Sequence, residues 1–144
     1  MSAIEIRGLD HVVLRIEDLE RAIVFYRDVL GCTVEREIEA LGLTQLRAGT
    51  ALIDLVDIAS PLGKVGGEKP DRGAPNMDHF AIELGSFDEA AIRAHLESHD
   101  ITVGEPGRRY GAGGYGASIY LKDPDGNTVE LKGPSSSDPT PGAP

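Results

Sequence analysis

One pattern occurs twice in this chain: an Asp-His pair opens a strand that leads directly into an amphipathic helix. The first copy lies in residues 9–31, and the second begins at Met77. In the first strand Val12, Leu14 and Ile16 share one side, while His11 stands on the other, and His79 has the same place in the second copy. An apolar strand face is what a helix packs against. The repeat therefore predicts two strand-helix units of the same design.

Each helix is followed by segments with the composition of short strands, so each unit reads as strand, helix and three strands. Asp18 is expected to cap the first helix and Gly31 to end it, while Ser86, with Glu89 completing a capping box, is expected to cap the second. The sequence predicts helices at 19–30 and from 86 to about 99, strands at 32–39, 43–47, 51–57, 101–105, 118–122 and 128–132, and a loop at 108–116. Residues 123–126, Asp-Pro-Asp-Gly, suit a type I turn.

Glycine and proline divide the chain. They are concentrated in residues 60–76, which have the composition of a connector. We therefore expect a first module at 1–59 and a second at 77–133. Residues 134–144 are rich in Pro and Ser and cannot bury enough apolar area to order themselves, so a disordered tail is expected there.

Superposing the two units aligns two imidazoles and two carboxylates. His11 corresponds to His79, and Asp54 in Leu-Ile-Asp-Leu corresponds to Glu130 in Thr-Val-Glu-Leu. All four point away from the helix-packed side of their strands. A lone strand histidine is usually structural, but the repetition favours a site for one divalent metal ion. Imidazole and carboxylate donors suit Ni, Co, Zn, Mn or Fe(II).

Charge and hydropathy exclude several partners. The formal net charge of −10 argues against nucleic acid and anionic membranes, because both repel an acidic protein. No apolar run approaches the length of about 20 residues that a membrane span needs. We expect a cytoplasmic protein that acts on a small molecule.

The sequence resembles the vicinal oxygen chelate superfamily, which includes glyoxalase I, extradiol dioxygenases, fosfomycin-resistance thiol transferases, methylmalonyl-CoA epimerase and bleomycin-resistance proteins. The resemblance covers residues 9–132, and its carriers are Leu9-Asp10-His11, the helix positions 18–22 with Phe25-Tyr26 and Leu30-Gly31, Asp78-His79, and 123–127 leading into Val129-Glu130-Leu131. It implies an α+β fold in which two paired βαβββ modules form a cupped, open, eight-stranded mixed sheet with the helices outside. It also implies a metal within the cup and a homodimer.

The resemblance to bacterial glyoxalases assigns the metal positions to His11, Asp54, His79 and Glu130, and a substrate carboxylate to Arg15. Asp54 is one methylene shorter than the Glu those enzymes have, so it reaches the metal directly or only through water. Ile58 replaces a substrate-binding Asn, which weakens a glutathione adduct as the substrate.

Five further residues are candidates for substrate binding. Tyr120 and Lys122 share the inward parity of Arg15 and could contact an anionic substrate. Arg109, Tyr110 and Tyr115 lie in the expected glycine-rich loop, which reads equally well as a closing lid or as an ordinary flexible connection.

The chemistries of the superfamily share a metal that stabilises negative charge developing on substrate oxygens as an enolate or oxyanion. By resemblance, Glu130 is the candidate that moves a proton, with Asp54 second. The leading hypothesis is a metal-dependent, glyoxalase-type lyase or isomerase acting on a small oxygenated metabolite. The alternatives are an Fe(II) extradiol dioxygenase or thiol transferase, and a metal-free protein that sequesters a drug, as bleomycin-resistance proteins do.

Overall fold

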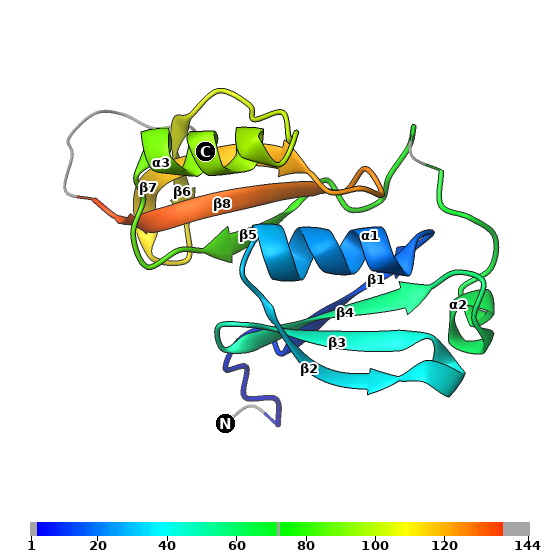
Figure 1. The fold of residues 1–144 in the computed structure, drawn as a ribbon. Helices are drawn as coiled ribbons and strands as arrows, with labels where there is room; N and C mark the ends of the chain where they lie inside the picture. The colour runs from blue at the N-terminus through cyan, green and yellow to red at the C-terminus, as the bar shows by residue number, and fades with distance from the viewer. Residues whose placement is uncertain (1–2, 72, 137–144) are drawn as a thin grey trace. The chain divides into compact units, whose positions relative to one another are not determined.

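The computed structural model describes residues 3–71 and 73–136 and divides the chain into two compact units (Figure 1). The first unit comprises Met1–Lys69 and the second Pro70–Pro144. Each contains one four-stranded mixed sheet, so the α+β class and the βαβββ modules are confirmed, with the eight strands divided between two open sheets. The boundary between the units falls inside the stretch 60–76 that the sequence identified as a connector.

The first sheet is built from β1 (His11–Ile16), β2 (Thr33–Ile38), β3 (Leu43–Ala48) and β4 (Ala51–Asp57). The strand order is β1-β4-β3-β2, in which β1 runs parallel to β4 and the other pairs are antiparallel. The 3-10 turn η2 (Glu39–Leu41) joins β2 to β3, and α2 (Pro61–Val65) follows β4 with Ser60 as its N-cap. Because β1 is parallel to its neighbour, the chain needs a crossover, which the first helix supplies.

That helix begins as predicted but changes its winding. The Asp18 carboxylate accepts a hydrogen bond from the Arg21 amide at 3.1 Å, and α1 (Leu19–Ile23) continues into the π-helical segment η1 (Val24–Val29). The buried residues Ala22, Phe25, Tyr26 and Val29 have i, i+3, i+4, i+7 spacing and form one apolar stripe. Phe25 lies beside Tyr26, with ring centroids 4.9 Å apart. These rings cover the apolar face of β1 and β4, where Leu14, Ile16, Ile53 and Leu55 are buried.

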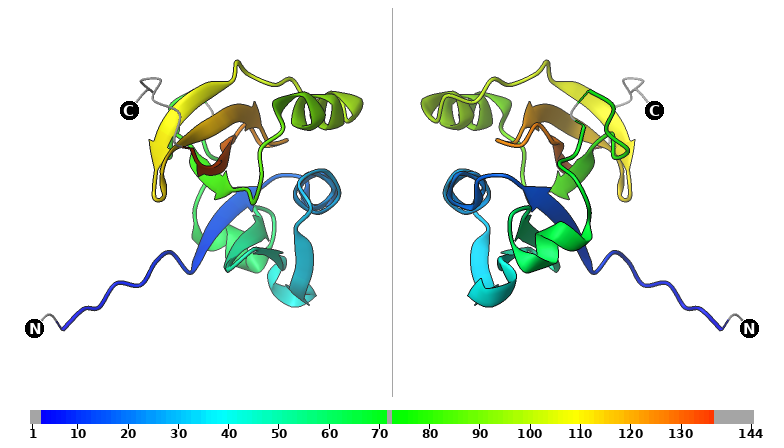
Figure 2. Two further views of the ribbon diagram at one scale, coloured as in Figure 1. Left: turned by 90° about the vertical axis from the view of Figure 1, so that its left-hand side faces the viewer. Right: turned by 90° about the vertical axis from the view of Figure 1, so that its right-hand side faces the viewer.

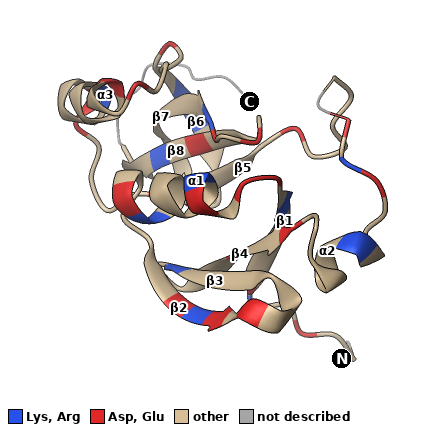
Figure 3. Ribbon diagram, turned by 45° about the vertical axis from the view of Figure 1, so that its right-hand side comes forward, with Lys and Arg blue, Asp and Glu red and all other residues tan. Residues whose placement is uncertain are grey.

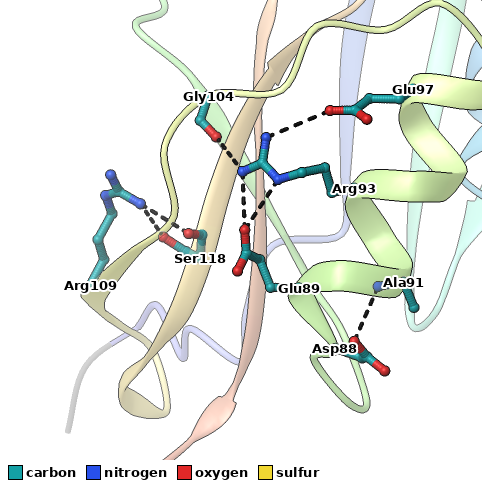
Figure 4. A network of polar contacts seen from close by, with 8 residues as sticks. All are labelled: Asp88, Glu89, Ala91, Arg93, Glu97, Gly104, Arg109 and Ser118. Carbon is teal, nitrogen blue, oxygen red and sulfur yellow. Dashed lines mark hydrogen bonds and ion pairs between the residues drawn. The ribbon is translucent and has the colours of Figure 1, made fainter.

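The second sheet repeats the design with β5 (Phe80–Glu83), β6 (Gly107–Gly111), β7 (Gly114–Lys122) and β8 (Thr128–Ser135) in the order β5-β8-β7-β6. Here α3 (Glu89–Ser98) is the crossover between β5 and the later strands. Arg93 on α3 donates to the carbonyl of Gly104 and pairs with Glu89, which fastens the helix to the segment that follows it (Figure 4). The buried apolar residues are Leu96, Ile119, Leu121, Val129 and Leu131.

Several expectations for the second unit were wrong in detail. The N-cap of α3 is Asp88, whose carboxylate accepts from the Ala91 amide, and not Ser86. The strand expected at 101–105 is a single bridge between Val103 and Leu121. The expected loop at 108–116 is instead a β-hairpin of β6 and β7, because its glycines occupy strand and turn positions. β8 also continues to Ser135, past the expected start of the tail, and the remainder of that tail, 137–144, lies outside the described residues.

The segment before β1 is extended and exposes Ile4, Ile6 and Leu9 (Figure 2). Acidic and basic positions alternate along β2 (Figure 3). Within residues 3–71 and 73–136, no helix has the length and hydropathy needed to cross a membrane.

Candidate metal centre

The first unit brings one imidazole and one buried carboxylate onto the same sheet face. His11 opens β1 and Asp54 lies within β4, where Val13 is its register partner. Since register partners in adjacent strands share a face, and His11 and Val13 alternate to the same side, both functional side chains project together. Asp54 is only 4% exposed.

Only one of the two oxygens of the Asp54 carboxylate has a hydrogen-bond partner among the described residues. Its Oδ2 accepts a hydrogen bond of 3.0 Å from the Gln45 side-chain amide. Its Oδ1 is buried and has no hydrogen-bond partner among the described residues. A buried carboxylate oxygen without a donor is costly, and a bound cation would satisfy it.

The second unit holds the equivalent pair at closer range. His79 lies directly before β5, and its Nε2 is 3.6 Å from Oε1 of Glu130 on β8. Glu130 is 5% exposed and also accepts a hydrogen bond from Tyr120, its register partner on β7. The Tyr120 ring stands edge-on to the His79 imidazole, with centroids 5.1 Å apart.

The residue before each histidine fixes its imidazole. Nδ1 of His11 lies 2.7 Å from an Asp10 oxygen, and Nδ1 of His79 lies 2.6 Å from an Asp78 oxygen. An ionised carboxylate can only accept here, so Nδ1 carries a proton, and in the neutral imidazole Nε2 keeps its lone pair. This carboxylate-histidine arrangement is typical of metal-binding imidazoles.

These contacts also shift two pKa values. The hydrogen bond to Asp10 raises the pKa of His11, and the charge of Asp54 adds to the rise while desolvation opposes it. Burial, together with the hydrogen bond to Glu130, raises the pKa of Tyr120. Tyr120 therefore remains a protonated donor to Glu130 at neutral pH.

Three of the predicted substrate residues have definite contacts. Arg15 donates from Nη2 to the carbonyl of Gly67 at 2.6 Å. Arg109 lies over the Tyr120 ring at 4.4 Å and donates from Nη1 to the carbonyl and hydroxyl of Ser118 (Figure 4). Lys122 donates to the hydroxyl of Thr128 at 2.5 Å. Arg109 is thus separated from the second imidazole-carboxylate pair only by the Tyr120 ring.

Tyr110 and Tyr115 are register partners across the β6–β7 hairpin, with ring centroids 5.0 Å apart. Arg109 pairs with Gly116, the next position, so the two tyrosines project from the opposite face of the hairpin. The two alternatives from the sequence, a closing lid and a flexible connection, both required a loop at these residues. The structure has a β-hairpin there instead. A role for Tyr110 and Tyr115 in substrate binding stays a prediction.

The donor atoms of these residues are of the kinds that bind a divalent cation. Each unit supplies an imidazole nitrogen and a buried carboxylate, and Asp54 retains an acceptor oxygen without a partner among the described residues. Within the described ranges no group of three or more His, Cys, Asp and Glu side chains is assembled for a metal. What the structure shows is therefore one imidazole-carboxylate pair in each unit.

Three residues of this site were not predicted from the sequence. Asp10 and Asp78 orient the imidazoles, and Gln45 holds Asp54. The repeated Asp before His was a usable signal for the first two. Gln45 gave none, because its role depends on the strand register between β3 and β4.

Comparison with known proteins identifies the family of this chain. A profile of the glyoxalase/bleomycin resistance protein/dioxygenase superfamily matches residues 8–131. The chain belongs to this superfamily. It is 31% identical over 124 residues to a catechol-2,3-dioxygenase of Bacillus subtilis, covering 85% of this chain and 40% of that protein. This chain therefore spans less than half the length of that relative.

Two further comparisons cover more of the other protein. The glyoxalase domain-containing protein RDO1 of Mycosarcoma maydis is 34% identical, with 89% of this chain and 69% of that protein covered. The crystal structure of virulence protein STM3117 from Salmonella typhimurium superposes with a TM-score of 0.72 at 26% identity, covering 92% of this chain and 100% of that one.

The structure of a lactoylglutathione lyase from Agrobacterium tumefaciens superposes with a TM-score of 0.62 at 25% identity, covering 88% of this chain and 92% of that one. Relatives within one superfamily thus carry names of different reactions.

Proposed function

We propose that this protein is a metal-dependent lyase or isomerase of the glyoxalase type that acts on a small oxygenated metabolite. The observation that supports it most directly is the repeated pair: in each unit an Asp-oriented imidazole and a buried carboxylate share one sheet face. A structural histidine would need no such partner in both units. The acidic chain, with a net charge of −10, favours a small molecule over nucleic acid.

The proposed ligands are Nε2 of His11 and His79 with the carboxylates of Glu130 and Asp54. Nickel, cobalt, zinc, manganese or iron would suit these donors. When bound, such an ion supplies Lewis-acid stabilisation of negative charge developing on the substrate's oxygens.

The chain's own residues then handle the proton. Glu130 takes a proton from the substrate carbon next to the activated oxygens and returns it to a neighbouring position. Tyr120 donates a hydrogen bond to the Glu130 carboxylate and limits its rotation. The low exposure of Glu130 keeps bulk water from competing for that proton.

An extradiol dioxygenase is the second candidate, favoured by the 31% identity to the Bacillus subtilis catechol-2,3-dioxygenase. It would use the same donors with iron, and a thiol transferase would use them with another divalent ion. A metal-free, drug-sequestering protein would leave the oriented imidazoles without a purpose.

The test is elemental analysis of tag-free protein purified without chelators, beside His11→Ala, His79→Ala and His99→Ala. About one equivalent of Ni, Co, Zn or Mn, lost in the first two variants and kept in the third, supports the lyase or isomerase. Iron in its place moves the dioxygenase to the front. Equal metal content in His79→Ala and wild type contradicts the site, and no metal after reconstitution supports the drug-binding alternative.

We also propose a homodimer, and mixed dimers distinguish a site within one chain from a site across two. If each site combines the first unit of one chain with the second unit of the other, a dimer of His11→Ala with His79→Ala chains contains one intact site. It then binds one metal per dimer, although neither variant binds metal alone. If each site lies within one chain, the mixture stays metal-free.

A further inference from the structure

A second group of side chains on the sheet of the second unit has the properties of an anion-binding site. It consists of Lys132 on β8, Arg109 on β6 and the glycines beneath them, Gly107, Gly111 and Gly116. Lys132 lies two residues beyond Glu130 and so projects from the same face of β8. The group therefore adjoins the proposed catalytic carboxylate.

Lys132 is only 8% exposed, yet within residues 3–71 and 73–136 its ammonium has no recorded hydrogen bond or ion pair. An ammonium is strongly hydrated, so lysine is almost never buried without a partner. An anion from outside the chain would supply the partner that this ammonium lacks among the described residues.

Arg109 contributes the second charge. Its Nη1 is engaged by Ser118, which is the register partner of Lys132 on β7. Its Nη2 and Nε make no hydrogen bond in the described part of the chain. The guanidinium is held flat on Tyr120 and retains donors for a carboxylate or phosphate.

The glycines provide the room that both cations occupy. A Cβ at Gly111 would lie 2.9 Å from Cε of Lys132, and one at Gly116 would lie 3.1 Å from its Nζ. A Cβ at Gly107 would lie 2.9 Å from Cζ of Arg109. Lys132 therefore reaches across Gly116 on β7 to Gly111 on β6, and Arg109 lies across Gly107 of its own strand, so a side chain at any of these glycines would displace a cation.

We propose that Arg109 and Lys132 form a subsite for a carboxylate or phosphate group of the substrate. Its place beside Glu130 makes it the anchor for the part of the substrate remote from the reacting oxygens. This inference deepens the proposed function and, for its catalytic meaning, rests on it. The binding of an anion can nevertheless be measured without metal or turnover.

The experiment is an amide NMR titration of metal-free protein with inorganic phosphate and, separately, with acetate. We expect saturable shifts at Gly107, Gly111, Gly116 and Ser118, since glycine amides are well dispersed. Lys132→Met keeps the stem and removes the charge, and it should weaken binding about tenfold, the loss of one charge-assisted contact. Lys64→Met, at an exposed position on α2, is the matched control and should bind as wild type does.

A second variant tests geometry without changing charge. Gly111→Ala should displace the Lys132 stem and weaken anion binding, whereas Gly85→Ala, which has open space around it, should not. Tighter binding of acetate than of phosphate identifies a carboxylate substrate, and the reverse identifies a phosphate. Equal binding by wild type and Lys132→Met, or shifts spread over all lysines, overturns the subsite.

The proposed metal site and the proposed anion subsite can each be disproved without disproving the other. His79→Ala should lose metal but keep the phosphate shifts. Normal metal binding with no anion shifts removes only the subsite. Anion shifts in a protein that never binds metal remove only the proposed lyase or isomerase.

Discussion

The two imidazole-carboxylate pairs share a scaffold but differ in how each carboxylate is held. Glu130 receives a phenolic hydrogen bond from Tyr120 and lies 3.6 Å from the His79 imidazole. Asp54 receives an amide hydrogen bond from Gln45 and keeps one buried oxygen unpaired. Gln45 and Tyr120 are equivalent positions, each the register partner of its carboxylate. The repeat has therefore preserved a donor opposite the acid while changing its chemistry.

This difference suggests a division of labour between the two units. Glu130 is one methylene longer than Asp54 and lies beside the Tyr120 ring, which the Arg109 guanidinium covers. The shorter Asp54 is held within β4 by a neutral donor. A group that moves a proton needs reach, whereas a group that only binds a cation needs a fixed lone pair. We therefore place proton transfer on Glu130.

The largest expected effect comes from removing that proton carrier. Glu130→Gln keeps the shape and should lower kcat about 10²–10⁴-fold, the usual contribution of a positioned acid or base. Asp54→Asn should cost less, about 10–100-fold, as expected for a group that supports the metal. The measurement is kcat with metal-saturated protein on whichever glyoxalase or epimerase substrate it turns over. Equal losses in both variants would contradict the division of labour.

The next effect concerns the carboxylates that orient the imidazoles. Asp78→Asn and Asp10→Asn should each weaken metal affinity about 10–100-fold, because Nδ1 loses its charged acceptor and Nε2 becomes a poorer ligand. Competition with a coloured chelator measures the affinity, and Asp71→Asn serves as an exposed control. Unchanged affinity in both variants would reduce the Asp-His contacts to surface hydrogen bonds.

A smaller effect on stability tests the donors opposite the two acids. Gln45→Leu leaves the buried Asp54 carboxylate with no donor and should lower the free energy of unfolding by about 1–3 kcal/mol. Tyr120→Phe should cost less, because Glu130 still faces the His79 imidazole at 3.6 Å. Urea unfolding of metal-free protein gives both values. A larger loss in Tyr120→Phe would reverse this ranking.

The sequence predicts the features that the two units repeat, but it does not predict the features that depend on how the strands pair. The Asp-His strand openings, the Asp18 cap, the strands of the first unit and the strand face that each His shares with its carboxylate could all be predicted from spacing and alternation. The β6–β7 hairpin could not, because Gly111, Gly114 and Gly116 have loop composition while their strand pairing is long-range. The proposed anion subsite of Arg109 and Lys132 could not be predicted from the sequence for the same reason. It exists only once β6, β7 and β8 are in register.

The smallest expected effect concerns the helix caps, where sequence and structure disagree for one unit only. Asp18→Ala and Asp88→Ala should each lower the free energy of unfolding by about 1 kcal/mol, because each carboxylate accepts the amide three residues on at 3.1 Å. Ser86→Ala should change it by less than about 0.5 kcal/mol, as for an ordinary surface position. Both values come from urea unfolding. A loss in Ser86→Ala as large as that in Asp88→Ala would restore the capping box that the sequence predicted and would make the two helix starts different in kind.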